Sequence, residues 1–300
     1  MPSLTSLPFP VITAEARPEE PPKPHTLLFT APMVIENLPP YRPEHPTTVA
    51  LYQELLIKAQ AFASPAVSGR RVGAIAIGES GKAYLGANIE IKGCAPGDTI
   101  HAETFAIALA RTHGETGLRA MVQTLQPCGS CRQILAETGS PTLSVHILNP
   151  DTAENTHERI DNLFPRSYSY ATAALNLFKH PPLALYHESP DAPPLIESAL
   201  HGARQCYLPN PGRKTWSGIA AQLKNGKVYT GGAITISGPN PTITPIQDLF
   251  IQLIAHGESL NDIEHVHMIE PRQPDYSFFR NSEAVLEKVA PCATIHKTQT

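Results

Sequence analysis

Four side chains in the first half of the chain have the types and spacing of a metal site. His101 and Glu103 lie two positions apart in "HAETFAIA", and Cys128 and Cys131 lie three apart in "PCGSC". Two thiols at this spacing on a helix point the same way and can hold one ion. The first turn of a helix also favours the thiolate, the form that binds metals, because exposed backbone amides stabilise negative charge there.

One neutral imidazole and two thiolates form a three-ligand set for Zn²⁺ and leave the fourth tetrahedral position for water. This arrangement is typical of a catalytic site, since a structural site closes with a fourth residue. Glu103 is then a natural proton shuttle beside the water, whose pKa zinc lowers to about 7. A Cys-x-x-Cys pair alone would also suit a structural half-site or a redox pair, but the joint pattern is much rarer.

The surrounding sequence predicts the elements that must position these side chains. A helix that begins at Thr47 or Thr48 precedes a hairpin, and a helix over residues 101–113 is followed by a strand over 119–126. A second helix starts at Cys128 and leads into the strand "LSVHIL". In this αββαβαβ order helices separate the later strands, which implies parallel pairing with crossovers. We expect an α/β fold of three layers, with a mixed sheet flanked by helices.

The second half of the chain repeats this order without the reactive side chains. Residues 242–258 align without gaps with residues 99–115, but Thr244 and Ile246 replace the His and the Glu of the first copy. The other expected elements are a helix from about Leu195, a hairpin over 215–236, a helix over 245–256, a strand near "IEHVHMI", a helix near "SEAVLEKV" and a last short strand. The later helix has no Cys-x-x-Cys, so this degenerate copy predicts one zinc per chain.

Length and proline content suggest how the chain is divided. With 300 residues the chain is about twice the usual domain length, which favours two domains. Twelve of the 31 prolines lie in residues 1–46, a density at which neither helix nor strand propagates well. We predict an extended or partly disordered Pro-rich arm over 1–46, a catalytic domain over 47–180, a linker over 181–194 and a degenerate non-catalytic domain over 195–300.

Composition and charge exclude several classes of protein. Hydrophobic residues make up 41% of the chain, and the sequence has no apolar run of membrane-spanning length. We therefore expect a soluble protein with no membrane partner. The net charge of −4 gives no electrostatic footprint for a nucleic acid. Five cysteines do not suggest a disulfide framework and no secretory signal is visible, so the cytoplasm is the expected location.

"GANIEI", "HAETFAIA" and "PCGSCRQIL", followed by a degenerate second copy, resemble the two-domain, homodimeric type of cytidine deaminase found in some bacteria and plants. The resemblance covers residues from about 47 to 300, and its His-x-Glu and Pro-Cys-x-x-Cys are identified as the signature of zinc deaminases of nucleobases. It implies a cytidine-deaminase-like fold present twice. It also implies a homodimeric hydrolase that converts the small molecules cytidine and 2′-deoxycytidine to the uridine nucleosides and ammonia, in pyrimidine salvage.

Carried over residue by residue, the resemblance makes His101, Cys128 and Cys131 the zinc ligands. Glu103 would take a proton from the zinc water and deliver it to ring N3 while hydroxide attacks C4, and a second transfer would help ammonia leave. The backbone of Ala102 would contact the base.

Other family residues would hold the sugar and the cysteines. Asn88 and Glu90 match an Asn-x-Glu that holds the ribose hydroxyls, and their spacing puts both side chains on one face of a strand. An ordinary solvated strand end would also explain them. Arg132 would support the cysteine thiolates, and an ordinary surface arginine on a helix is the alternative.

Some positions depart from the family pattern. Arg70 stands where the family usually has an aromatic residue near the base, and it brings charge and reach that Phe lacks. "PRSYSYATAAL" replaces a Phe-Gly-Pro segment that approaches the partner subunit's pocket, and Tyr168 is the candidate for its aromatic residue. A shift of one residue puts Gln247 against Glu103, a substitution the family tends to show. We expect mutation of Gln247 to alter stability or dimerisation before zinc content.

Two further functions remain open at this point. A zinc deaminase of another base or nucleoside, such as guanine or a nucleoside antibiotic, is favoured by Arg70, whereas the low charge and the Asn-x-Glu argue against a polynucleotide. A non-catalytic nucleoside-binding protein would need a structural zinc with a fourth residue as ligand. The free coordination position and Glu103 oppose that alternative.

Overall fold

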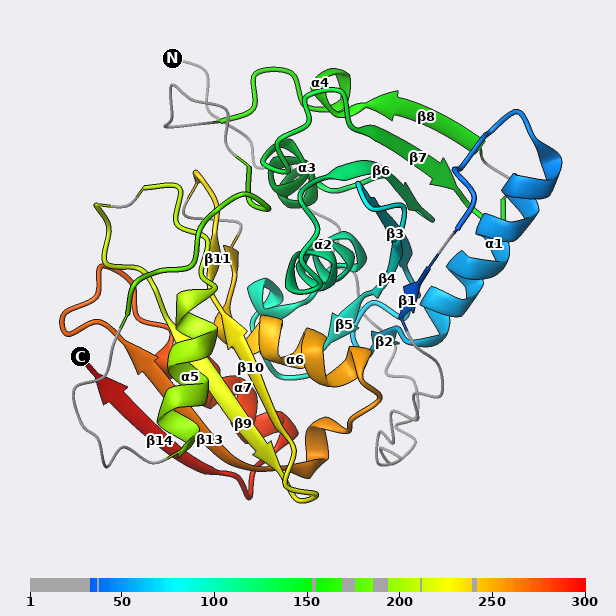
Figure 1. Ribbon diagram of the computed structural model, residues 1–300. Helices are drawn as coiled ribbons and strands as arrows, with labels where there is room; N and C mark the ends of the chain where they lie inside the picture. Colours follow the sequence, from blue (N-terminus) through cyan, green and yellow to red (C-terminus); the bar gives the residue numbers. More distant parts are fainter. Residues whose placement is uncertain are drawn as a thin grey trace, which may run out of the picture.

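The structure, a computed structural model, describes residues 33–36, 38–152, 155–168, 176–185, 194–210, 212–238 and 242–300. Most of the predicted arm and most of the predicted linker lie outside these ranges. The described residues form two α/β units, called the first copy and the second copy, which lie side by side (Figure 1). Each copy has one main sheet with helices on both of its faces.

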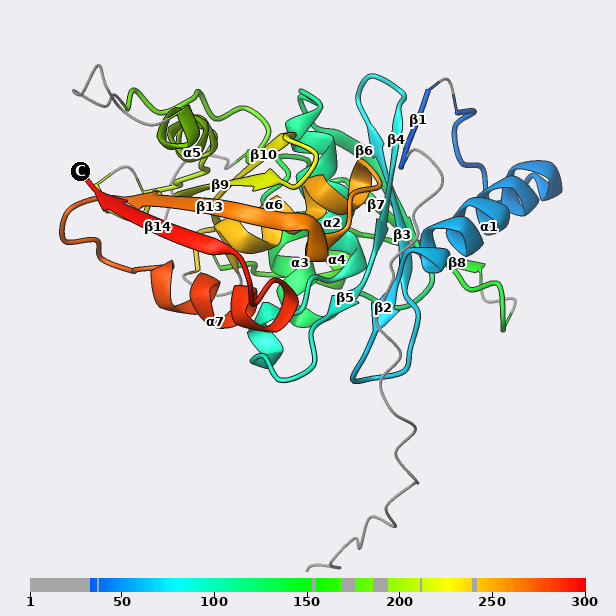
Figure 2. The same cartoon turned by 90° about the horizontal axis from the view of Figure 1, so that it is seen from below.

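The first copy contains a mixed sheet with the strand order β1-β4-β3-β6-β7-β8. These strands are β1 (Val34–Ile35), β3 (Gly73–Gly78), β4 (Ala83–Ala87), β6 (Leu118–Gln123), β7 (Ser144–Leu148) and β8 (Asn155–Arg159). The antiparallel hairpin of β3 and β4 and the parallel pairing of β6 and β7 agree with the sequence predictions, and the remaining neighbours pair antiparallel. One face is covered by α1 (Pro46–Ala61), and the other by α2 (Ala102–Thr112) and α3 (Gly129–Ala136) (Figure 2). The remaining elements are β2 (Ser64–Pro65), which pairs with β5 (Ile89–Glu90), η1 (Pro96–Asp98) and α4 (Ile160–Leu163).

The second copy has the same strand arrangement, β10-β9-β13-β14, with β13 and β14 parallel. Its strands are β9 (Gly218–Leu223), β10 (Val228–Gly232), β13 (Ile263–Glu270) and β14 (Thr294–Gln299), with a small pair β11 (Ile234–Thr235) and β12 (Thr242–Ile243). Its helices are α5 (Pro194–Arg204) on one face, α6 (Pro245–Ala255) and α7 (Phe279–Val289) on the other, and the short η2 (Leu260–Asp262). The order β10-β9-β13-β14 matches β4-β3-β6-β7, so the predicted duplication is confirmed.

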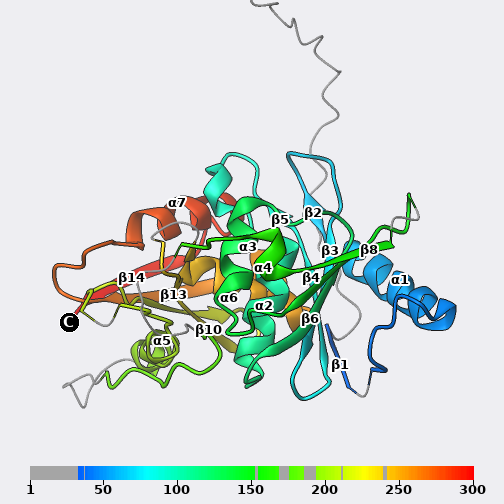
Figure 3. The same ribbon diagram turned by 90° about the horizontal axis from the view of Figure 1, so that it is seen from above.

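The helices α2 and α6 lie next to each other between the two sheets (Figure 3). Phe105 and Leu109 of α2 share one buried hydrophobic cluster with Phe250 and Leu253 of α6. The two copies therefore bury apolar surface against each other through the helices that are equivalent in the repeat, and the stability of each depends on the other.

The helix caps fix how the two copies correspond. His101 is the N-cap of α2 and Thr244 is the N-cap of α6, so the alignment without gaps is the structural one. In this register Gln247 corresponds to Thr104, and its proposed match to Glu103 is wrong. Cys128 and Phe278 are the N-caps of α3 and α7. Cys128 is extended whereas Phe278 is already helical, so these two caps relate α7 to α3 without a residue-by-residue match.

A glycine in each copy lets the equivalent helix approach its sheet closely. A Cβ atom at Gly86 would lie 2.1 Å from the carbonyl oxygen of Ala102, and one at Gly231 would lie 2.3 Å from that of Pro245. Both distances are far below van der Waals contact, so only glycine allows the first turn of α2, which carries Glu103, to sit at this depth.

Some boundaries and strands differ from the predictions. Helix α1 begins at Pro46 with His45 as its N-cap, so the predicted start at Thr47 or Thr48 is wrong. Proline at the first helical position suits the fixed φ of its ring and needs no hydrogen-bond partner for nitrogen. Strand β8 has the sequence "NTHER" with all five side chains exposed, so it carries no apolar alternation that could reveal it.

A buried histidine on β7 makes stability sensitive to acid. His146 is 7% exposed, its ring packs 4.7 Å from Tyr41 and 5.4 Å from His157, and its Nδ1 has no hydrogen-bond partner among the described residues. Burial, with a further contribution from His157, lowers the pKa of His146 from 6.5 to about 4. Below pH 6.5 the unfolded chain takes up this proton first, so stability present above that pH is lost as the pH falls towards 4.

We expect protonation of His146 to lower the free energy of unfolding by on the order of 2 kcal/mol as the pH falls from 6.5 towards 4. Urea unfolding of wild type and of His146→Leu at several pH values measures the difference. The variant should lose less stability on acidification, whereas His265→Leu, which changes an exposed histidine, should follow the wild type. Equal pH dependence of the wild type and His146→Leu would contradict the assignment.

Candidate metal centre

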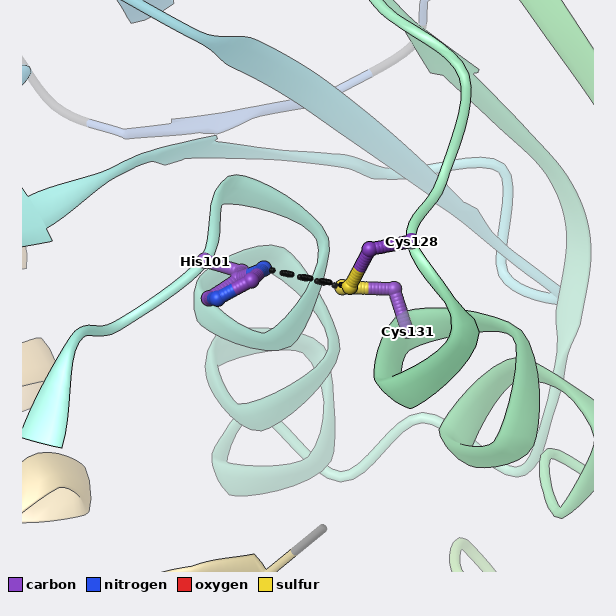
Figure 4. Close-up of side chains that lie close together, drawn as sticks. All are labelled: His101, Cys128 and Cys131. Carbon is purple, nitrogen blue, oxygen red and sulfur yellow. Dashed lines mark hydrogen bonds between the residues drawn. The ribbon is translucent and has the colours of Figure 1, made fainter. Parts of the chain in front are cut away.

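The three predicted metal ligands converge at the N-termini of α2 and α3 (Figure 4). The Nδ1 atom of His101 lies 3.5 Å from Sγ of Cys128 and 3.4 Å from Sγ of Cys131, and the three donor atoms lie within 4.8 Å of one another. Tetrahedral zinc with ordinary bond lengths places a nitrogen and a sulfur ligand about 3.6 Å apart. One nitrogen and two sulfurs at these distances fit Zn²⁺.

The two cysteines differ in acidity because each sulfur interacts with the other and their burial differs. Hydrogen bonds from Cys131 and from His101 lower the pKa of Cys128 to about 3. The pKa of Cys131 is raised, first by its hydrogen bond to Cys128 and then by burial. The hydrogen bond to Cys128 likewise raises the pKa of His101. The three donor groups therefore influence one another's protonation, and a divalent cation binds them in their deprotonated forms.

Glu103 lies in the first turn of α2, next to the donor atoms. It is 5% exposed, and burial raises the pKa of its carboxyl group. Its side chain also forms a hydrogen bond with Cys131. A carboxyl group with a raised pKa, placed beside a metal site, suits a residue that both accepts and donates a proton.

Asn88 lies beside the strand that leads to His101, because Ile89 and Ile100 form an antiparallel bridge. Asn88 is 6% exposed, so the alternative of a solvated strand end does not hold for it. Its Oδ1 accepts a hydrogen bond of 2.8 Å from the Val72 backbone, and its Nδ2 donates to the Arg70 carbonyl at 2.9 Å. Asn88 therefore fixes the backbone on both sides of residue 71.

Glu90 holds the same loop from its other end. Its carboxylate accepts hydrogen bonds from the backbone of Val67 at 2.8 Å and of Ser68 at 2.7 Å, and from the Ser68 hydroxyl at 2.6 Å. Burial alone would raise the pKa of Glu90, but these bonds outweigh it and hold the pKa below its usual range. Asn88 also donates to Glu90 at 3.2 Å. This loop-holding role is one that the sequence did not reveal, although the "VSGRR" turn marks the loop itself.

Three other predicted residues have different surroundings. Arg70 borders an open cleft of about 850 Å³. Arg132 donates hydrogen bonds to the carbonyls of Pro127 at 2.9 Å and of Leu163 at 3.1 Å, so it supports the cysteine-bearing turn through the backbone. Tyr168 is 51% exposed, and its carbonyl accepts from Gln133 at 2.8 Å. Its approach to a partner subunit stays a prediction.

Two family models match the chain, each with the description "cytidine and deoxycytidylate deaminase zinc-binding region". One matches residues 48–147 and the other matches residues 165–282, which together make up more than half of the chain. The chain belongs to the cytidine and deoxycytidylate deaminase family. Zn²⁺ is accordingly the cofactor, and the donor set of His101, Cys128 and Cys131 fits it.

Alignments with known relatives cover most of the length of this deaminase. It is 32% identical over 237 residues to the cytidine deaminase of Vibrio cholerae serotype O1, covering 79% of this chain and 78% of the relative. It is 33% identical over 217 residues to the cytidine deaminase of Proteus mirabilis, covering 72% and 71%. The crystal structure of cytidine deaminase from Burkholderia pseudomallei matches with 27% identity and a TM-score of 0.37, over 40% of this chain and 98% of that one.

Two properties of the described residues of this deaminase bear on earlier expectations. All five cysteines are free thiols in the structure. Within the described ranges, no helix has the length and apolar character needed to cross a lipid bilayer.

Proposed function

We propose that this deaminase hydrolyses cytidine to uridine and ammonia. The observation that carries the proposal is the set of one imidazole and two thiols at tetrahedral zinc distances, with the buried Glu103 beside it. A set of three protein ligands leaves one position for water, which is typical of catalytic zinc. The names of the Vibrio cholerae and Proteus mirabilis relatives support the choice of cytidine.

The chain's own residues account for the proton transfers. When held by His101, Cys128 and Cys131, Zn²⁺ would supply the nucleophile for C4 by lowering the pKa of water to about 7. Glu103 would accept a proton from the attacking water and donate it to ring N3. A second transfer through Glu103 protonates the leaving amino group, which departs as ammonia. One water is consumed, and the 4-amino group is replaced by oxygen.

Binding of the nucleoside is assigned to the residues around the bridge between Ile89 and Ile100. Asn88 and Glu90 hold the ribose hydroxyls, and the backbone of Ala102 contacts the base. This assignment is supported by the position of Asn88 beside the segment that leads to His101. The same two side chains fix the loop that carries Arg70, so sugar binding and the position of Arg70 are coupled.

We also propose the finer features that the resemblance implies. These are 2′-deoxycytidine as a second substrate, a homodimer with Tyr168 near the partner subunit's pocket, and pyrimidine salvage in the cytoplasm. The domain limits proposed are 47–180 for the catalytic domain and 195–300 for the non-catalytic one, after the arm over 1–46 and the linker over 181–194. The match of the two strand orders supports these limits.

A panel of possible substrates tests this function. Purified enzyme with measured zinc content is given cytidine, deoxycytidine, cytosine, dCMP, adenosine and guanine, and the loss of substrate absorbance is followed. Turnover of cytidine is expected to be among the fastest. Zinc-loaded enzyme that is inactive on both cytidine and deoxycytidine would rule the proposal out. Activity on another base would then favour the alternative that Arg70 suggests, and tight binding without turnover would favour a binding protein.

A further inference from the structure

Side chains of the second copy hold the loop that leads to the metal ligand of the first copy. This loop, the ligand loop, runs from Ala95 through η1 to Ile100, directly before His101. The Nε2 atom of Gln247 donates hydrogen bonds to the carbonyls of Gly97 at 3.0 Å and of Thr99 at 3.3 Å. Both acceptors lie within four residues of His101.

The capping box of α6 fixes the orientation of the Gln247 amide. Its Oε1 accepts from the backbone nitrogen of Thr244 at 2.8 Å and from the Thr244 hydroxyl at 3.1 Å. With its oxygen on two donors, the amide presents its nitrogen to the two carbonyls of the ligand loop. Gln247 is 6% exposed, so water competes little for these bonds.

A second contact comes from α7. The Nδ2 atom of Asn281 donates to Oδ1 of Asp98 at 2.5 Å, and Oδ2 of Asp98 accepts from the Ala95 backbone at 2.9 Å. Asp98 is 8% exposed, so its carboxylate closes the loop on itself and ties it to α7. Asn281 lies in the first turn of α7.

We propose that Gln247 and Asn281 are positioning residues that hold the ligand loop so that Nδ1 of His101 meets the two thiols. The inference rests on the proposed zinc site. It assigns a structural role to the second copy, which has no metal ligands of its own at the equivalent helix. On the opposite side the loop is fixed by the backbone pairing of Ile100 with Ile89. β5 and the second copy therefore hold the ligand loop from two sides, directly before His101.

This assignment changes the expectation for Gln247. The sequence suggested that its mutation would alter stability or dimerisation before zinc content, whereas its amide contacts the carbonyl of Thr99, two residues before the ligand His101. Partners that orient metal ligands commonly contribute about 10–100-fold in metal affinity. Zinc retention is therefore the property that should respond first.

The test compares two alanine variants of the same helix. Gln247→Ala removes two donated hydrogen bonds at the ligand loop. Gln252→Ala also removes two, one of 3.1 Å to the Thr112 hydroxyl at the C-terminal end of α2, far from the zinc ligands, and one of 3.2 Å to Asp248 within α6. Gln247→Glu keeps the oxygen that accepts from Thr244. It replaces the donating nitrogen with a carboxylate oxygen, which repels the two carbonyl oxygens of the ligand loop. The rate at which zinc passes to an excess of a colorimetric chelator is measured for each, with thermal unfolding in parallel.

We expect zinc release to become about tenfold faster in Gln247→Ala and faster still in Gln247→Glu, while Gln252→Ala releases zinc like the wild type even where it unfolds at a lower temperature. Substitution with Co²⁺ gives a second readout, because the visible bands report the geometry of the ligands. Equal release rates for Gln247→Ala and Gln252→Ala would overturn the proposal.

Hydrogen exchange in the metal-free protein separates this proposal from the proposed function. Amides of the ligand loop should exchange faster in Gln247→Ala than in Gln252→Ala without any zinc present. A wild-type protein that binds no zinc would refute the catalytic proposal, and the exchange data would still decide whether Gln247 holds the loop. Unchanged exchange in the loop would refute the positioning role.

Discussion

The Glu103→Gln variant is expected to keep its zinc and to lose cytidine turnover by at least about 10²–10⁴-fold. The amide is nearly the same size as the carboxyl group, so the first turn of α2 should stay in place beneath the donor atoms. It cannot accept and then return a proton, and the reaction needs two such transfers. The loss should appear in kcat more than in KM, since the interaction is made with the reacting atoms.

Glu137→Gln is a matched control for this variant. Glu137 is also buried, at 3% exposed, and burial raises its pKa as it does for Glu103. Its carboxylate accepts a hydrogen bond of 2.8 Å from the backbone of Ser237, at the C-terminal end of α3 and away from the donor atoms. This change should affect stability and leave turnover within a few-fold of wild type. Near-normal activity of zinc-loaded Glu103→Gln would refute the proton-shuttle assignment.

Cys128→Ala is expected to abolish zinc binding while the metal-free chain still folds. Cys128 is an exposed N-cap, so removal of its sulfur leaves no cavity in the core. The remaining imidazole and thiol form too small a set to retain zinc against a chelator. Zinc content, measured by elemental analysis, should fall from about one per chain to near zero, and activity should fall with it.

Thermal unfolding provides an independent measure of the same loss. A metal that binds only the folded state raises its stability by mass action, so chelation should lower the melting temperature of the wild type and leave Cys128→Ala unchanged. Cys292→Ala, which removes another exposed thiol, should behave as the wild type does. A Cys128→Ala protein with full zinc content would show that the metal binds elsewhere.

The parts of the fold that sequence could predict are those that depend on local patterns. The helices at His101 and Cys128 follow from apolar periodicity, and both are confirmed. The duplication follows from the repeated order of elements. Strand β8 escaped prediction because a strand exposed at every position has no pattern of burial to display.

The contacts that could not be predicted join residues far apart in the chain. Gln247 bonds to Gly97, 150 positions away, and nothing near either residue in sequence indicates that α6 packs against that loop. The same holds for Asn281 and Asp98, which are 183 positions apart. Such bonds depend on how the two copies pack, and this packing emerges only when their apolar helices have been buried together.

The hydrogen bonds of Thr244 and Asn281 make the loss of the second metal site hard to reverse. A renewed site would need a histidine in place of Thr244, the N-cap equivalent to His101, and two cysteines at the start of α7, where Asn281 lies. Thr244→His removes the hydroxyl that helps to orient Gln247, and Asn281→Cys removes the bond to Asp98. Either change would thus loosen the ligand loop of the first site before a new ion could bind. The working metal site of this chain thus opposes the return of a second site.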